Sequence, residues 1–300
     1  MIKQPPHLKK GDKIAIVCPA KKLPKRIDDA VALLEGWGLK VIIGDSVYAS
    51  ENQFAGNDKL RTADLQRFLD DPEVKAIIAG RGGYGTIRII DELDFTEFIA
   101  SPKWIIGFSD ITVLLAHILA QTETMSIHGQ MPYTFSDASR ESLISLQNAL
   151  FGKSNVYKIP SSPLNISGNA EGILTGGNLT LLVMLSNSVS DIDYTDKILF
   201  IEDVGEQESS IDRMIRMLKR SGKLAGLKGL IVGAINEIES EAIPFGATPQ
   251  QIIHDLVKEY GYPVCFDFPT GHINDNRALI LGQTIKLIVD NHAVELKPNL

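Results

Sequence analysis

The fold is decided by the stretch Lys103-Trp104-Ile105-Ile106-Gly107-Phe108-Ser109-Asp110-Ile111-Thr112. Its first half is a short apolar run that ends at Gly107, which is typical of a buried strand. Residues 111–119 then have the apolar spacing of a helix. The stretch therefore predicts a strand, a sharp turn that contains Ser109, and a helix.

Ser109 has two interpretations. In a nucleophile elbow, the turn exposes Oγ, and the helix N-terminus offers free N–H groups to an oxyanion. In an N-cap, the side chain of Ser109 or Asp110 instead accepts a hydrogen bond from the first helical turn. The motif also lacks the last glycine of G-x-S-x-G, because Ile111 stands there. On this stretch alone the N-cap is the favoured interpretation.

The composition is that of an ordinary globular protein, with 300 residues, 44% hydrophobic and 22% charged. This length allows two domains. The net charge of −7 argues against a nucleic-acid partner. The chain has no signal-peptide core and no apolar run of about 18–20 residues, so we expect a cytoplasmic protein without a membrane partner. Cys18 and Cys265 are the only cysteines, and their apolar surroundings predict buried thiols.

The first half of the chain alternates short apolar strands with helices, which predicts a parallel sheet flanked by helices. Before the central stretch, we expect strands at 13–18, 39–43 and 74–79 and helices at 26–35 and 57–69. A helix at 139–150 closes this α/β domain, which spans residues 1–151. Residues 152–168 are rich in Gly, Pro, Ser and Asn and are expected to be a linker.

The second half, residues 169–300, is expected to be a smaller β-rich domain, so the fold class is α/β with two domains. Its expected strands include 198–201, 229–235 and 264–268, and its expected helices are 178–185 and 211–218. The segments 277–281, 284–289 and 293–296 suggest a closing antiparallel meander.

Residues 80–85 contain four glycines and follow the strand at 74–79. In parallel sheets ligands bind at the carboxyl ends of strands, and Ser109 follows such an end as well. The loop matches neither G-x-G-x-x-G nor a P-loop. It is either a turn that needs positive φ or, beside a serine nucleophile, a source of N–H groups that form an oxyanion hole with the amide of Asp110.

A serine nucleophile needs a base and an acid that orients the base. Of six histidines, His272 is the best placed, in a loop after the strand at 264–268, and His128 is also possible. A loop histidine bonded to a backbone carbonyl is the alternative. Glu202 ends the strand at 198–201 and could orient the imidazole, or it could form a cap or salt bridge, whereas alternation turns Asp203 the other way. No metal-binding motif is present, so no metal or cofactor is expected.

Four motifs in order make the chain similar to the LD-carboxypeptidases, also called murein tetrapeptide carboxypeptidases. They are Gly80-Arg81-Gly82-Gly83-Tyr84-Gly85, Gly107-Phe108-Ser109-Asp110, Glu202-Asp203-Val204-Gly205-Glu206 with Ile211-Asp212-Arg213-Met214, and Pro269-Thr270-Gly271-His272.

The resemblance implies that Ser109 is the nucleophile, His272 the general base and Glu202 its orienting acid. The region of Gly82 and Gly83, with the amide of Asp110, would hold the oxyanion. It also implies a homodimer without metal or cofactor, whose substrate is a small peptide, the muropeptide. Family members release the terminal D-alanine of cytoplasmic muropeptides by cutting an L-to-D bond.

One departure concerns the substrate. Ser209 and Ser210 stand where the family often has an aromatic and a basic residue. The same family includes microcin C immunity proteins, which cleave aminoacyl-nucleotide antibiotics. Three hypotheses therefore remain at this point: a muropeptidase, a hydrolase of aminoacyl- or peptidyl-nucleotides, and a non-catalytic protein that binds a small anion.

Overall fold

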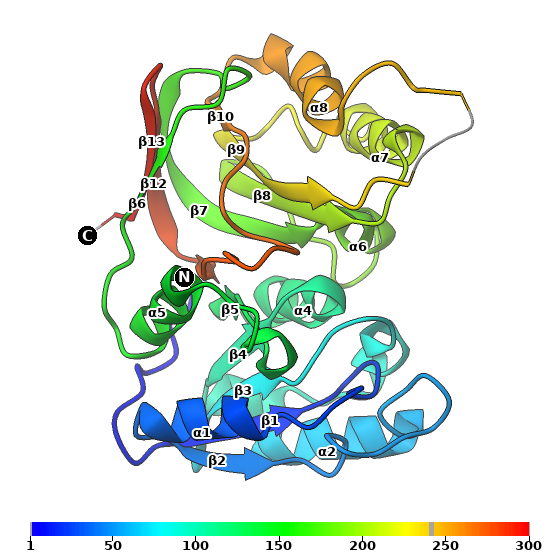
Figure 1. The fold of residues 1–300 in the computed structure, drawn as a ribbon, viewed down its shortest axis with the longest axis vertical. Helices are drawn as coiled ribbons and strands as arrows, with labels where there is room; N and C mark the ends of the chain where they lie inside the picture. The colour runs from blue at the N-terminus through cyan, green and yellow to red at the C-terminus, as the bar shows by residue number, and fades with distance from the viewer. Residues whose placement is uncertain (1, 240–242, 300) are drawn as a thin grey trace.

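The computed structural model describes residues 2–239 and 243–299, which form two sheets with their helices. In Figure 1 the first half of the chain forms the lower body, and the second sheet lies above it. The strand order is β11-β5-β4-β3-β1-β2 in the first sheet and β10-β9-β8-β7-β12-β13-β6 in the second.

The first sheet is parallel from β2 to β5, as predicted, and β11 joins it antiparallel to β5. Its strands are β1 Lys13–Val17, β2 Lys40–Ile43, β3 Val74–Ala79, β4 Trp104–Gly107, β5 Ser126–His128 and β11 Leu279–Leu281. The α-helices of this half are α1 Asp28–Gly36, α2 Asp58–Asp70, α3 Thr96–Ala100, α4 Thr112–Thr122 and α5 Arg140–Leu150. The shorter 3-10 helices are η1 Thr86–Arg88, η2 Ile90–Glu92, η3 Ser109–Ile111 and η4 Pro132–Thr134.

Both faces of this sheet are buried, because helices cover each side. Along β1, Ile14 and Ile16 join the core formed with α1 and α5, whereas Ala15 and Val17 join the core formed with α2 and α4. Alternate residues of a strand point to opposite faces, so an uninterrupted apolar run marks a strand that is covered on both sides. The core beneath α4 continues into the second sheet, since α4 also packs against α6 and β7.

The second sheet is mixed. Strands β7 to β10 are parallel, whereas β12, β13 and β6 are antiparallel to their neighbours. The strands are β6 Tyr157–Pro160, β7 Gly168–Asn178, β8 Lys197–Val204, β9 Gly229–Asn236, β10 Val264–Cys265, β12 Thr284–Val289 and β13 Ala293–Pro298. The helices are α6 Leu179–Met184, α7 Glu208–Arg220, α8 Pro249–Val257 and the 3-10 helix η5 Lys258–Tyr260.

Two segments differ from the expectations. The segment 152–168, expected to be a linker, contributes β6, which pairs with β13 at the edge of the second sheet. The prediction of a three-stranded meander is wrong. Leu279, in β11, pairs with His128 in the first sheet, so of the three expected strands only β12 and β13 pair with each other. Turn residues mark where a strand ends, but the packing of the whole chain decides which sheet it joins.

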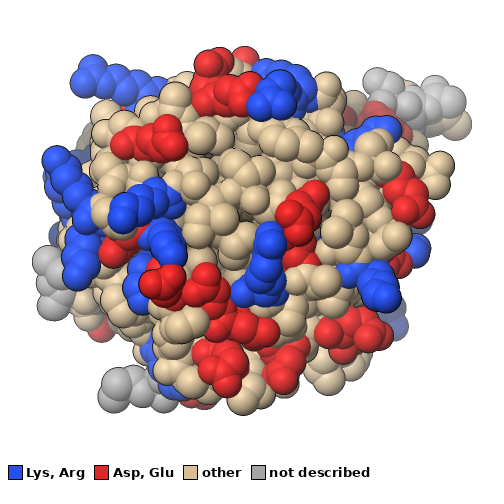
Figure 2. All heavy atoms as spheres, turned by 90° about the horizontal axis from the view of Figure 1, so that it is seen from below, with Lys and Arg blue, Asp and Glu red and all other residues tan. Residues whose placement is uncertain are grey.

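The surface seen in Figure 2 carries Lys and Arg side chains next to Asp and Glu side chains, so both signs of charge are mixed across that face. No helix in residues 2–239 and 243–299 combines the length and apolar character needed to cross a membrane. Cys18 and Cys265 are both buried, as predicted, and burial raises the pKa of each thiol to about 12.

Candidate active site

Ser109 lies two residues after the end of β4 and has a φ of 62°, in the left-handed region that non-glycine residues rarely adopt. Neither η3 nor α4 has a side-chain cap. The carboxylate of Asp110 instead accepts the N–H of Thr86 at 2.8 Å. The N-cap interpretation is therefore wrong. The turn holds the serine in a strained conformation, and Asp110 ties this turn to the end of the glycine loop.

Close backbone packing explains the glycines around the serine. A Cβ atom on Gly107 would lie 2.7 Å from Cγ2 of Ile111, so the start of the helix packs directly against the end of β4. A Cβ on Gly82 would lie 3.0 Å from Cβ and 3.2 Å from Oγ of Ser109, and 3.3 Å from the amide nitrogen of Asp110. Gly82 therefore lets the glycine loop approach both the serine and the amide that follows it.

Gly83 has a different neighbour from Gly82, although both line the cavity described below. Its φ is 110°, and a Cβ there would lie 2.5 Å from Cδ of Lys21. Of the two predicted glycines, only Gly82 has Ser109 among the atoms nearest to such a Cβ. Gly83 packs instead against the lysine stem.

Arg61 holds the glycine loop in place, a role that was not predicted from the sequence. Its side chain is fully buried, and Nη1 donates to the carbonyl of Gly85 at 3.0 Å. The guanidinium also bonds the carbonyl of Pro19 and the carboxylate of Asp58. It thus joins the loop after β1, the glycine loop and α2. The sequence gives no signal for this role, because an arginine within a helix is normally solvated.

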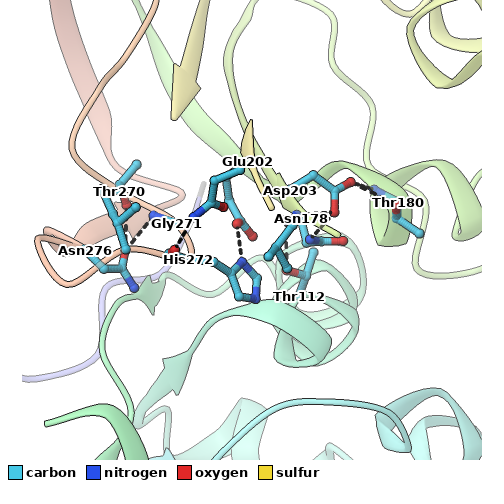
Figure 3. A network of polar contacts seen from close by, with 12 residues as sticks. Thr112, Asn178, Thr180, Glu202, Asp203, Thr270, Gly271, His272 and Asn276 are labelled. Atoms are coloured by element: carbon cyan, nitrogen blue, oxygen red, sulfur yellow. Dashed lines mark hydrogen bonds and ion pairs between the residues drawn. The ribbon is translucent and has the colours of Figure 1, made fainter. Parts of the chain in front are cut away.

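The carboxylate of Glu202 bonds the imidazole of His272, with 2.7 Å between Oε2 and Nδ1 (Figure 3). A carboxylate only accepts, so Nδ1 carries the proton of this bond. The Glu202 side chain is fully buried in β8, and that of His272 is 20% exposed. Asp203 points away: it accepts from Asn178 Nδ2 and from the N–H of Thr180, each at 2.9 Å. The predicted alternation of Glu202 and Asp203 is confirmed.

Charge and burial act in opposite directions on these groups. Burial lowers the pKa of His272, but the charge and hydrogen bond of Glu202, with the charges of Asp203 and Glu237, raise it above the ordinary value of 6.5. Burial, followed by the Glu202 charge, raises the pKa of Asp203. The Glu202 carboxylate therefore stabilises the protonated form of the imidazole.

His128, the alternative base, is fully buried. Burial, and then the charge of His272, lowers the pKa of His128 to about 3. Its ring packs edge-on against Phe200, with 4.8 Å between the centroids. The lining of the cavity described below includes His272 but not His128. His128 is therefore a neutral core residue.

The loop that carries His272 is held by the second sheet. Gly271 has a φ of 111°, and a Cβ there would lie 2.8 Å from Cβ of Glu202. The side-chain oxygen of Asn276 accepts the N–H of Gly271 and contacts the hydroxyl of Thr270, each at 2.9 Å (Figure 3). Asn236, at the end of β9, donates to the carbonyl of His272 at 2.8 Å. The loop conformation is thus set by buried polar groups.

The same loop is also bonded to the first half of the chain. Gln130, which is 2% exposed, donates to the carbonyl of Asn274 at 3.1 Å. The N–H of Ser139 donates to that carbonyl at 2.8 Å, and its hydroxyl bonds Asp275 at 2.7 Å. Gln130 was not predicted as a site residue, because nothing in the local sequence marks it.

A cavity of about 640 Å³ lies where these loops meet. Ser109 and Gly82 line it from the first half of the chain, and His272 and Glu237 line it from the second half. Ser209 and Ser210 do not line it, and both lie in α7, where the Ser209 carbonyl accepts Nε of Arg213 at 3.0 Å. Within the described residues no group of His, Cys, Asp and Glu side chains has the arrangement needed to hold a metal ion.

The chain thus has a two-domain α/β fold in which loops from both halves line one cavity. Residues 14–129 match the LD-carboxypeptidase N-terminal domain, and residues 171–287 match the LD-carboxypeptidase C-terminal domain. The chain belongs to the LD-carboxypeptidase family, which confirms the resemblance seen in its motifs.

Individual relatives extend over nearly the whole chain. A probable murein peptide carboxypeptidase of Bacillus subtilis is 35% identical over 287 residues, which are 93% of this chain and 89% of that protein. The microcin C7 self-immunity protein MccF of Escherichia coli is 25% identical over 300 residues, covering 89% and 86% of the two chains. The crystal structure of muramoyltetrapeptide carboxypeptidase from Oxalobacter formigenes matches with a TM-score of 0.86 and 29% identity, over 96% of this chain and 99% of that one.

Proposed function

We propose that this enzyme is a serine carboxypeptidase that releases the terminal D-alanine from murein tetrapeptides by cutting an L-to-D bond. The observation that carries the proposal is that Ser109 and His272 line one cavity, with Glu202 bonded to the far side of the imidazole at 2.7 Å. The names of the Bacillus and Oxalobacter relatives support a murein-peptide substrate.

In the proposed reaction, Nε2 of His272 takes the proton of Ser109, and Oγ attacks the carbonyl of the penultimate residue. The amides near Gly82 and Asp110 stabilise the oxyanion, and each such donor contributes about 10²–10³ in rate. The imidazole then protonates the leaving amine, D-alanine departs, and water releases the peptide from the acyl-enzyme. Glu202 keeps the proton on Nδ1, which leaves Nε2 free to act as the base.

The direct test is to incubate the enzyme with a muropeptide tetrapeptide ending in D-alanine and to follow the products by mass spectrometry. We expect the wild type to release one alanine and Ser109→Ala to release none at the same enzyme concentration. Release by Ser109→Ala at the wild-type rate contradicts the assignment of the nucleophile. No release by a folded wild type contradicts the substrate.

A second candidate is hydrolysis of an aminoacyl- or peptidyl-nucleotide, because MccF is related over most of the chain. The same catalytic groups would act, and only the leaving group would differ, with the nucleotide part of the substrate in place of D-alanine. An aminoacyl sulfamoyl nucleoside and the tetrapeptide, offered separately, distinguish the two, since the preferred substrate has the higher kcat/KM. The third hypothesis, a non-catalytic protein, is not retained, because the chain belongs to a peptidase family.

We also propose that the enzyme is a cytoplasmic homodimer without metal or cofactor, as the family resemblance implies. Light scattering coupled to gel filtration measures the oligomeric state, and a monomer mass contradicts the dimer. Cell fractionation tests the location. Full activity after exhaustive dialysis against a chelator is expected.

A further inference from the structure

We propose that Arg81, assisted by Lys21, binds the C-terminal carboxylate of the peptide that is cut. This inference rests on the proposed function, because it identifies the group that makes the enzyme a carboxypeptidase. A peptidase that removes only the last residue must recognise the terminal carboxylate. A partly desolvated carboxylate needs a positive partner to offset its lost hydration.

The two cations are available for a ligand. Lys21 and Arg81 both line the cavity that contains Ser109. Neither forms an ion pair with any residue in the described ranges 2–239 and 243–299. This contrasts with Arg61 and Arg88 nearby, which are both paired with Asp58. The charges of Lys21 and Arg81 are thus left without an acidic partner at the cavity.

The guanidinium of Arg81 is held in place before any ligand binds. Its Nη1 donates to the carbonyl of Lys22 at 3.0 Å, and it stacks over the ring of Tyr133, 4.9 Å from the centroid. The N–H of Tyr133 in turn donates to the carbonyl of Gly80 at 3.0 Å, at the start of the glycine loop. A planar guanidinium with remaining N–H groups matches the two oxygens of a carboxylate, and fixing it in advance lowers the entropy lost on binding.

The position of Arg81 fits the geometry of the substrate. Arg81 directly precedes Gly82, which lies against Ser109 and the amide of Asp110. The scissile carbonyl and the terminal carboxylate belong to adjacent residues, whose Cα atoms are about 3.8 Å apart. Because Arg81 and Ser109 line the same cavity, a substrate whose scissile carbonyl faces Ser109 places its terminal carboxylate in the cavity that Arg81 lines.

The acidic side chains of the cavity also favour a position of the substrate carboxylate beside Arg81 and Lys21. Asp137 and Glu237 also line it, and both would repel a carboxylate. Lys21 differs from Arg81, because its stem packs on Gly83, and its ammonium is a point charge without a fork. We therefore assign the oriented contact to Arg81 and a supporting charge to Lys21.

The experiment compares a tetrapeptide that ends in a free D-alanine carboxylate with the same peptide ending in D-alanine amide. Arg81→Ala is expected to raise KM for the free acid about 10- to 100-fold, the range of a charge-assisted hydrogen-bonded contact, with a smaller change for the amide. Arg81→Lys keeps the charge but loses the fork, so we expect an intermediate loss. Lys25→Ala is the matched control, because Lys25 also lies over Tyr133, 5.6 Å from its centroid, but does not line the cavity.

An equal change for acid and amide in Arg81→Ala, or an unchanged preference for the acid, overturns the proposal. If Arg81→Ala does not fold, the acid-to-amide ratio of Arg81→Lys decides. Failure of the proposed function is distinguished by calorimetric binding of both peptides to Ser109→Ala and to Ser109→Ala/Arg81→Ala. Preferential binding of the acid that disappears in the double variant supports the carboxylate contact even if no cleavage occurs. Equal binding of acid and amide to Ser109→Ala overturns it.

Discussion

Ser109 and His272 face the same cavity, but the chain holds them there in different ways. Ser109 is positioned by its own backbone, with a φ of 62° at the first residue of η3 and with Gly82 packed against it. His272 lies in a loop and is positioned by side chains. Glu202 bonds its imidazole, and Asn276 accepts the N–H of the preceding residue, Gly271.

The difference shows which kind of change each region tolerates. On the serine side, an added methyl group disturbs the geometry, because atoms of the glycine loop and the turn are already in contact. On the histidine side, the loss of a charge or of a hydrogen-bond acceptor matters more, because buried polar groups must be satisfied. Substitutions of four kinds test this distinction.

The largest effect is expected from removing the two groups themselves. Ser109→Ala and His272→Ala should each lower kcat/KM by roughly 10³-fold or more, and the double variant should be little worse, because such groups act as a unit. Ser209→Ala and His292→Ala are matched controls, since neither residue lines the cavity. Additive losses in the double variant contradict the assignment of a joint role.

Glu202→Gln is expected to lower kcat by roughly 10²–10⁴-fold, because an orienting carboxylate sets the tautomer of its histidine. It also removes the charge that raises the pKa of His272 and leaves burial, which lowers it. A base must be neutral, so the acidic limb of kcat/KM against pH should move to lower pH. Asp203→Asn should move that limb less, since its charge contributes less than that of Glu202.

The sign of the stability effect follows from the same shift. The pKa of His272 is raised in the folded state, so the stability gained from the imidazolium is full below about pH 6.5 and is lost as pH rises through the raised pKa. Thermal unfolding against pH should show this loss in the wild type and not in Glu202→Gln. If Glu202→Gln leaves both the acidic limb of kcat/KM and the pH dependence of Tm unchanged, Glu202 does not raise the pKa of His272 as proposed.

Gly82→Ala tests the backbone-positioned side. The new Cβ would lie 3.0 Å from Cβ of Ser109, so the loop or the serine must shift by a few tenths of an ångström. We expect kcat to fall about 10- to 100-fold with little change in Tm, because small displacements at reacting groups are costly. Gly36→Ala is the control, since a Cβ there meets nothing within 4 Å. A wild-type kcat in Gly82→Ala would show that catalysis does not require the close contact between the glycine loop and Ser109.

Asn276→Ala is expected to have the smallest effect on rate, roughly tenfold, because Asn276 acts on His272 indirectly, through its bonds to Thr270 and Gly271. It should lower Tm, since the Gly271 N–H loses its acceptor in a buried site. Asn291→Ala, in an exposed turn, is the control. A lower Tm with an unchanged rate and pH profile would show that Asn276 supports the fold and not the position of His272.

Local features of the fold were predictable from the sequence because they depend on neighbouring residues. The strand at 74–79 was predicted with its observed bounds, and the helix expected at 57–69 is α2, which the side chain of Asn57 caps. The turn at Ser109 was predicted from the strand and helix around it. The choice between a nucleophile elbow and an N-cap could not be predicted. It depends on the distant amide of Thr86, which donates a hydrogen bond to the carboxylate of Asp110.

By itself, the sequence determined the alternation of strands and helices, the turn after β4 that carries Ser109, and the family motifs. The strand end expected at Glu202 was wrong, because β8 continues to Val204 and Glu202 lies inside it. Only the tertiary structure decided that β11 leaves the expected meander, that Gln130 and Arg61 fix the loops, and that Glu202 and His272 lie within hydrogen-bond distance. The physical reason is the range of the interactions. Propensity and periodicity act within a few residues, whereas Glu202 and His272 are separated by 70 positions and meet only when the second sheet is packed.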